Sequence, residues 1–303
     1  MILDSSAMNI VGRRNIFYIL SGLLVAASLA AIATLGLTLG IDFTGGSILE
    51  LEFPSGRPAA DELSERIKPL ELGDVRVQPA GERGVFLRLR HIDEPTHQRL
   101  LEALGREAVE RRFDTIGPTI GRELRSRSLI AIGLVIILIV SYVAWAFRKV
   151  SAPVASWKYG VVTVVALLHD VLIPSGFFAL AGRVAGYEVD TLFITAILTI
   201  LGFSVHDTIV VFDRIRENLK HKAGTVDFAA IVGQSIRQTF TRSVNTSLTV
   251  LLALVAVLLA GGESTRAFSL TLIVGIVVGT YSSIFIASPL LVTWQRWSEG
   301  RGR

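Results

Sequence analysis

The sequence predicts an α-helical membrane protein, with six transmembrane helices and a small extracytoplasmic α+β domain between the first and second helices. Two observations predict this fold class. The 303 residues have a mean hydropathy of +0.55, yet 18% of them are charged. That combination is typical of membrane spans joined to a water-exposed domain. The basic residues also gather in short clusters beside apolar runs, as topology determinants do, so the net charge of +4 does not indicate a nucleic-acid partner.

Six apolar stretches are long enough to cross about 30 Å of hydrocarbon. We expect the spans at residues 16–39, 129–147, 159–181, 192–212, 244–260 and 268–291. The first follows Arg13 and Arg14, and its length favours an uncleaved span over a secretory signal. The third is expected to be interrupted at His169-Asp170 and at Pro174.

Residues 40–122 contain the only long polar region. Apolar periodicity predicts a strand at 47–53, a helix at 58–70, strands at 75–77 and 85–89, a helix at 94–112 and a strand at 113–116. This βαββαβ order is that of a ferredoxin-like sandwich. The region has no paired carboxylates or histidine cluster that would suggest catalysis. The sequence has no cysteine, so thiolate metal sites are excluded, and we expect neither a metal nor a cofactor.

Orientation follows from the basic residues of the short loops, which gather on one side of the predicted membrane. The side that we take as cytoplasmic carries Arg13, Arg14, Arg148, Lys149, Lys158, Arg214, Arg216, Lys220, Lys222, Arg237 and Arg242. The opposite short loops carry only Arg183 and Arg266. The predicted organisation is a cytoplasmic N-terminus at 1–15, a helix at 16–39, the external domain at 40–122, the five-helix remainder at 123–294, a cytoplasmic amphipathic segment at 213–243 and a cytoplasmic C-terminus at 295–303.

Within that amphipathic segment, apolar residues recur at helical spacing. They are Phe228, Ile231, Val232, Ile236 and Phe240. We expect a separate helix at the cytoplasmic surface, with this stripe packed against the bundle or lipid. The fifth span then begins with polar residues at 243, 245–247 and 249, which could line a wet path or hold helices together. Gly275 and Gly279 predict close helix packing in the sixth span.

The stretch from Thr199 to Asn218 carries the strongest functional signal, because Asp207 lies inside an apolar run. A carboxylate in a bilayer costs several kcal/mol, so such residues usually face a bundle interior or a water path. Asp170 on the neighbouring span could provide a second step for a proton, and Arg242 is the natural cation for Asp207. Alternatively, Asp207 only joins helices and Arg242 only anchors the fifth span. Each adjacent histidine is expected to pack between helices or to lie at an interface, and not to form a histidine–aspartate dyad, since neighbouring helix positions point about 100° apart.

Four segments match a known family: Ile41–Gly46 (IDFTGG), Gly117–Gly121 (GPTIG), His169–Val171 (HDV) and Asp207–Asn218 (DTIVVFDRIREN). On these motifs, which follow in order along nearly the whole chain, the protein resembles the SecF family of protein-export subunits, within the resistance-nodulation-division superfamily. His206 stands where asparagine is usual, and Phe212 where a small polar residue is usual. His206 could tune the pKa of Asp207 or respond to pH itself. The coupling ion stays open between proton and sodium.

The resemblance implies a proton-motive-force-driven role with SecD and the SecYEG translocon in the bacterial inner membrane. Secreted preproteins would be the substrate, and YajC-like and YidC-like factors further partners. Asp207 would carry the proton and Arg242 would be its partner, with Asp170 and His206 beside them. Residues of the glycine motifs would serve as hinges: Asp42, Gly45, Gly46, Gly117, Pro118 and Gly121. The cytoplasmic end motif would be Asp213, Arg214, Arg216 and Glu217.

Two other functions compete with this one. A structural scaffold subunit of the translocase, without ion coupling, predicts that asparagine can replace Asp207 at little cost. The other alternative is that this chain is half of a small-molecule exporter. Such an exporter has two copies of the six-span unit and large external domains, which this chain lacks. No nucleophile–base pair indicates an enzyme.

Overall fold

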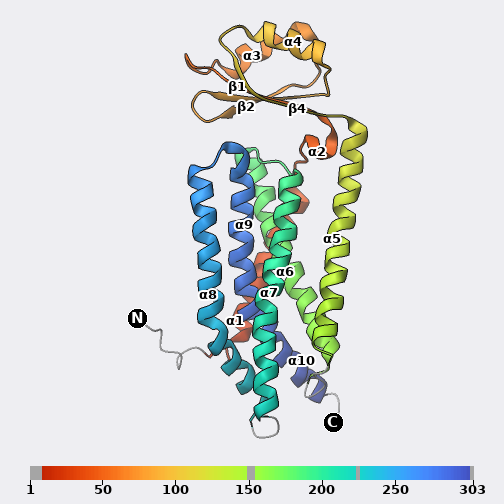
Figure 1. Ribbon diagram of the computed structural model, residues 1–303, viewed down its shortest axis with the longest axis vertical. Coiled ribbons are helices and arrows are strands. Elements are labelled where there is room, and N and C mark those ends of the chain that lie inside the picture. Colours follow the sequence, from red (N-terminus) through yellow and green to blue (C-terminus); the bar gives the residue numbers. More distant parts are fainter. Residues whose placement is uncertain (1–8, 149–153, 223–225, 301–303) are drawn as a thin grey trace. The chain divides into compact units, whose positions relative to one another are not determined.

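A computed structural model describes residues 9–148, 154–222 and 226–300 (Figure 1). Parts of the predicted termini at 1–15 and 295–303, as well as Lys149, lie outside these residues. The chain forms two compact units. The first runs up to Gly36 and continues through 132–183 and from Leu192 onward, and the second comprises 37–131 and 184–191.

The first unit is built from long apolar helices, and the described chain has six that could cross a membrane, with mean hydropathies from 1.8 to 2.7. They are α1 (Arg14–Leu35), α5 (Pro118–Ala146), α6 (Ser156–Ala185), α7 (Thr191–Lys222), α8 (Phe228–Ala260) and the series α9 (Glu263–Ser282), η2 (Ser283–Ala287) and α10 (Ser288–Gly300). The six-span prediction is confirmed. α6, α7 and the last span are about half buried, whereas α1, α5 and α8 expose most of their surface.

Two helices are longer than the sequence pattern predicted. α6 continues through Pro174, so the expected interruption of the third span is wrong. Proline is tolerated there because neighbouring helices can satisfy the backbone group that it frees. α5 begins at Pro118, well before the expected residue 129, since a proline at the first helical position gives up no hydrogen bond.

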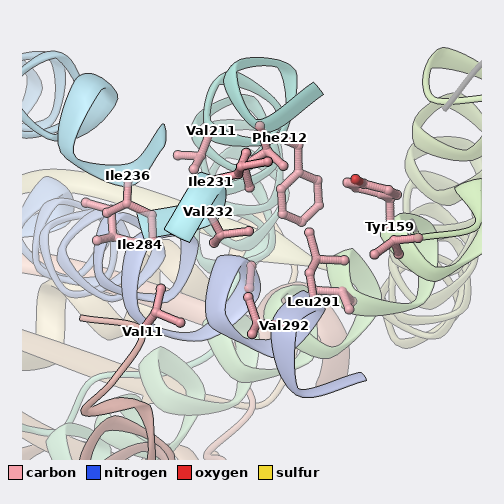
Figure 2. Packing of buried hydrophobic residues seen from close by; sticks show 14 of the residues in the cluster. Val11, Tyr159, Val211, Phe212, Ile231, Val232, Ile236, Ile284, Leu291 and Val292 are labelled. Atoms are coloured by element: carbon pink, nitrogen blue, oxygen red, sulfur yellow. The ribbon is translucent and has the colours of Figure 1, made fainter. Parts of the chain in front are cut away.

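The separate surface helix expected within 213–243 is also wrong. α7 runs to Lys222, and α8 carries the apolar stripe and the fifth span in one helix. Ile231, Val232 and Ile236 are buried in an apolar cluster with Phe212 and residues of α10, as Figure 2 shows. The stripe therefore packs against the bundle, as expected. Because serines at 235, 243 and 247 continue the buried face, nothing in the sequence ends the helix between the two halves.

The second unit contains the predicted βαββαβ domain. Its elements are β1 (Gly46–Glu52), α3 (Ala60–Ile67), η1 (Lys68–Leu70), β2 (Arg76–Ala80), β3 (Gly84–Leu89), α4 (Glu94–Leu104) and β4 (Val109–Ile116). The strands form one antiparallel sheet in the order β2-β3-β1-β4, which confirms the ferredoxin-like arrangement. α3 and α4 lie over one face of the sheet (Figure 1), and apolar side chains such as Leu49, Leu87 and Leu100 fill the space between them.

The second helix of this domain is shorter than the predicted 94–112. Asp93 caps its start by accepting a hydrogen bond from the backbone of Thr96. Gly105, with a φ of 91°, ends it, and the chain turns into β4 at Val109. Glycine adopts this positive φ without the steric cost that other residues meet, so it commonly ends a helix. The apolar periodicity alone does not include this signal, and it therefore predicted a helix that was too long.

Candidate functional site

Asp170 lies at the centre of a buried polar cluster in the first unit. Its side chain is 0% exposed. Ser282 on α9 donates to Oδ2 over 2.7 Å, and Ser204 on α7 donates to the same oxygen. His169 Nδ1 lies 2.8 Å from Oδ1, while His169 Nε2 is buried without a hydrogen-bond partner among the described residues. Three helices therefore meet on one carboxyl group.

The contact between His169 and Asp170 corrects the expectation that neighbouring helix positions keep the two side chains apart. The Cα–Cβ bonds of adjacent helix residues point about 100° apart, but the ends of both side chains can turn towards each other along the helix surface. The imidazole also lies against the Tyr281 ring, with centroids 6.2 Å apart. His169 thus packs between helices and contacts the carboxylate as well.

Asp207 on α7 is 6% exposed and has fewer partners. Ser243 Oγ on α8 donates to its Oδ1 over 2.5 Å, whereas Oδ2 is buried and has no hydrogen-bond partner among the described residues. Ser247, one turn further along α8, donates to the carbonyl of Ser243 and pairs with Thr280 on α9 over 2.5 Å. The polar start of the fifth span therefore joins helices around Asp207.

Hydroxyl groups also fill the space between the two carboxyl clusters. Thr208, next to Asp207, pairs with Ser283 Oγ over 2.8 Å. Ser283 in turn lies 3.4 Å from the carbonyl of Ser204, whose hydroxyl contacts Asp170. Ser283 begins the short π-helix η2, a widened turn that is frequent at functional sites. Since each hydroxyl both donates and accepts, this region can stabilise a carboxyl group in either protonation state.

The two other predicted coupling residues are placed differently. His206 is exposed, and it interacts electrostatically with the buried Asp207 beside it. Arg242 is also exposed and attracts Asp207 electrostatically, but it forms none of the ion pairs found among the described residues. Ser243, the next residue along α8, makes the direct contact with Asp207 instead.

The predicted cytoplasmic end motif forms a polar junction between α7 and α8. Arg214 contacts Glu217 over 2.6 Å and donates to Gln238 of α8 over 2.7 Å. Arg216 lies 3.6 Å from Asp213. Asn218 reinforces the junction by donating to Ser235 and Gln238, each over 2.8 Å.

The predicted hinge residues come together in the second unit. They are Asp42, Gly45, Gly46, Gly117, Pro118 and Gly121. Gly45 has a φ of 74° at the end of the short helix α2 (Ile41–Thr44), and a Cβ there would lie 2.8 Å from Pro118 Cα. A Cβ on Gly121, in the first turn of α5, would lie 2.8 Å from the backbone nitrogen of Gly45. Glycine is required at both positions because two backbone segments touch.

Sequence reasoning missed the serines of this site. Ser204, Ser282 and Ser283 have hydropathies near neutral, so they do not stand out in an apolar run. The signal that could have found them is their recurrence at four-residue spacing with small residues, as in Gly275, Gly279 and Ser283 on the last span. A Cβ at Gly279 would lie 3.0 Å from Ser204 Cβ, which confirms the close packing predicted for this glycine pair. The described residues contain no group of three or more histidine, aspartate or glutamate side chains placed to hold a metal ion.

Comparisons with known proteins bear on these motifs. The family described as "Protein export membrane protein SecD/SecF, C-terminal" matches residues 96–297, and the "SecD/SecF GG Motif" matches residues 30–53. The protein translocase subunit SecF of Thermobaculum terrenum is 42% identical over 315 aligned residues, which cover 95% of this chain and 94% of the relative. This chain belongs to the SecF family. The SecF subunit of Anaerolinea thermophila is 40% identical over 294 residues, again covering 95% and 94% of the two chains.

Solved structures give the same assignment. SecDF from Thermus thermophilus, described as a translocon-associated membrane protein, superposes with a TM-score of 0.83 at 34% identity. A structure of SecDF in a super-membrane-facing form gives 0.70 at 33% identity. This chain covers 39% and 40% of those SecDF chains, so it spans about two fifths of their length. SecF relatives are named as translocase subunits, which is a role in protein transport in the Sec pathway.

Proposed function

We propose that this SecF-family chain is a proton-coupled subunit that acts with SecD and the SecYEG translocon to move preproteins across the bacterial inner membrane. Protons pass through the helix bundle, and their passage drives movement of the βαββαβ domain. The observation that carries this proposal is the pair of buried carboxyl groups, Asp170 and Asp207, linked by hydroxyls on the helices between them. Buried carboxyl groups in a membrane span are costly, so they usually serve a function.

Asp207 is the residue that exchanges the proton in this proposal. Its Oδ2 is buried without a partner among the described residues, and such an oxygen is costly while it is charged. A proton on the carboxyl group removes that cost, whereas an approach of Arg242 compensates the charge. A proton that crosses the membrane potential releases about 2.3 kcal/mol per 100 mV. At 100 mV that energy is enough to shift the balance between the two arrangements about fiftyfold, since each 1.4 kcal/mol is about tenfold.

An exposed polar stripe on α8 supports a second membrane-spanning partner. Arg242, Asn245, Thr246 and Thr249 are exposed in the described chain and share one face of the helix. Polar groups that face lipid are costly, so another protein is expected to cover them. SecD is that partner in our proposal, since solved SecDF chains contain more than twice the length of this one. The translocon enters through the description of SecDF as translocon-associated.

The orientation inferred from the positive-inside pattern completes the proposal. Both termini face the cytoplasm, and the domain at 40–122 faces outward, where it meets emerging preproteins. The glycine motifs around Gly45 and Gly121 act as hinges for the domain. His206 adjusts the response of Asp207 to pH or to the identity of the coupling ion.

The test is export of a secreted reporter into membrane vesicles that carry Asp207→Asn, with and without a proton gradient. We expect gradient-stimulated export to disappear while the subunit still assembles with SecD, which is checked by co-purification from the same vesicles. Asp227→Asn, the same change at an exposed aspartate that precedes α8, serves as the matched control. If Asp207→Asn keeps full gradient dependence, Asp207 only joins helices, and the chain is a scaffold subunit.

A further inference from the structure

The segment 184–191, which joins α6 to α7, belongs to the second unit and not to the bundle. Val189 pairs with Leu39 as a parallel bridge. The backbone N–H of Val189 donates to Thr38 over 2.7 Å, and that of Gly40 donates to Val189 over 2.8 Å. Segments that follow α1 and α6 are thus bound to each other by backbone hydrogen bonds.

Side chains of the second unit bind the same segment at two further points and lie close to it at a third. Asp42 Oδ2 accepts hydrogen bonds from the backbone N–H and the hydroxyl of Thr191, over 2.8 and 2.6 Å. Gly186, with a φ of 72°, leaves space for Gln78 of β2, whose Nε2 would lie 2.9 Å from a Cβ at this position. Arg88 on β3 forms an ion pair with Glu188.

The Arg88–Glu188 ion pair is partly buried, with side chains 17% and 11% exposed. Burial lowers the pKa of Arg88, and the nearby Arg76 lowers it further, whereas Asp190 raises it. Arginine stays charged at working pH in spite of such shifts. Removal of one partner would leave the other charge partly buried and uncompensated, which costs far more than the loss of a surface pair.

The two ends of this segment continue directly into the helices that carry the buried carboxyl groups. α6 contains Asp170, and α7 contains Ser204 and Asp207. Because the segment is short and held at Glu188, Val189 and Thr191, it has little slack with which to absorb a shift of either helix. A shift of α6 or α7 along its axis must then pull on the sheet.

We infer that residues 184–191 form a strap that couples α6 and α7 to the βαββαβ domain, with the Arg88–Glu188 ion pair as its positioning contact. This inference rests on the proposed function, since it names the part that transmits the effect of protonation. Arg88 and Glu188 touch no proton path. They position the strap. A displacement of α6 or α7 is then transmitted to β3, whereas an unattached loop would absorb it.

The experiment measures export into vesicles, with and without a proton gradient, for Arg88→Glu, Glu188→Arg and the double exchange. Each single change should lower the stimulation by the gradient about tenfold, within the usual range for coupling between sites. Gradient-independent export and co-purification with SecD should stay unchanged. The double exchange should restore most of the stimulation, because it rebuilds the ion pair with its charges reversed.

Arg111 and Glu52 provide the matched control. They form an ion pair between β4 and β1 of the same domain, with side chains 58% and 33% exposed, and both residues lie outside the strap. Arg111→Glu and Glu52→Arg should leave the stimulation intact. The inference is overturned if Arg88→Glu and Glu188→Arg behave like these controls, or if the double exchange is as impaired as the single changes.

A second measurement separates this inference from the proposed function. Hydrogen exchange of the purified SecD-containing complex reports on the backbone amide of Val189, which donates to Thr38. This amide should exchange faster in Arg88→Glu and return towards the native rate in the double exchange. Unchanged exchange overturns the strap, whatever the vesicles show. Retained gradient dependence in Asp207→Asn overturns the proposed function instead.

Discussion

The two buried carboxyl groups of the bundle lie on neighbouring helices but in different surroundings. Asp170 is wholly buried and contacts His169, Ser204 and Ser282, so both of its oxygens have partners. Asp207 has one hydroxyl donor, and its second oxygen is buried without a partner among the described residues. The bundle thus holds one carboxyl group tightly and leaves the other incompletely satisfied.

This difference indicates which carboxyl group can switch between two arrangements. A buried carboxyl group whose two oxygens both have partners rigidifies the helices that supply them, because loss of the carboxyl group leaves those partners unsatisfied. A partly satisfied group lies closer to the balance between two arrangements, as an exchange site requires. We therefore expect mutations at Asp170 to affect folding most, and mutations at Asp207 to affect coupling most.

The largest expected effect comes from truncating the two carboxyl groups in turn. Asp170→Ala should lower the free energy of unfolding by about 3 kcal/mol, since three buried donors lose their acceptor. Asp207→Ala should cost about 1 kcal/mol, since one hydroxyl loses its partner. Reversible unfolding of the purified complex in mild detergent measures both values. Equal losses would contradict the contrast between the two sites.

Next in size is the packing that holds the last span against α7. Gly275→Ala should cost about 2 kcal/mol, because the added methyl group would clash with the side chain of Ile200. Gly202→Ala, on α7, is the control, since nothing lies within 4 Å of a Cβ at that position. The same unfolding assay compares them. If both changes are neutral, the close packing beside Ser204 does not support the Asp170 cluster.

A smaller effect is expected at His169. His169→Phe keeps a ring against Tyr281 but removes the contact with Asp170, so it should cost about 1 kcal/mol in the unfolding assay. His206→Phe, at the exposed histidine beside Asp207, should stay within about 0.5 kcal/mol. A larger loss at His206 than at His169 would reverse the assignment of the two histidines.

The smallest effect tests the single donor to Asp207. Ser243→Ala should cost about 0.6 kcal/mol, the average for hydrogen bonds between helices in membranes. In a double-mutant cycle, the same change made in Asp207→Ala should cost almost nothing, because its acceptor is already gone. Additive losses would show that Ser243 stabilises α8 independently of Asp207.

Local pattern accounts for much of what the sequence predicted correctly. Long apolar runs identify the six spans, because a membrane requires about 20 apolar residues in succession. Alternation around Leu49 and Leu51, together with the glycines near 81 and 84, identifies the sheet of the small domain. Asp170 and Asp207 stand out because charge is rare in apolar runs. The roles of these two residues and of Arg242 stay predictions.

Other features depend on contacts between segments far apart in the chain. Hydrophobic periodicity does not tell which serine of α9 or η2 meets Asp170, since that depends on how each helix is rotated about its axis. It also did not predict that α8 would run unbroken through the stripe and the span, or that His169 would bend towards its neighbour.

Sequence alone predicts the class of the protein, its six spans, the order of strands and helices in the domain and the two carboxyl groups. These features follow from the local pattern of apolar and polar residues, which indicates which positions are buried. The folded structure was needed to show which hydroxyls surround each carboxyl group, and that Glu188 pairs with Arg88 on a strand about 100 residues earlier in the chain. These partners depend on packing. A buried polar side chain forms hydrogen bonds or ion pairs with the groups that a neighbouring helix or strand places within reach.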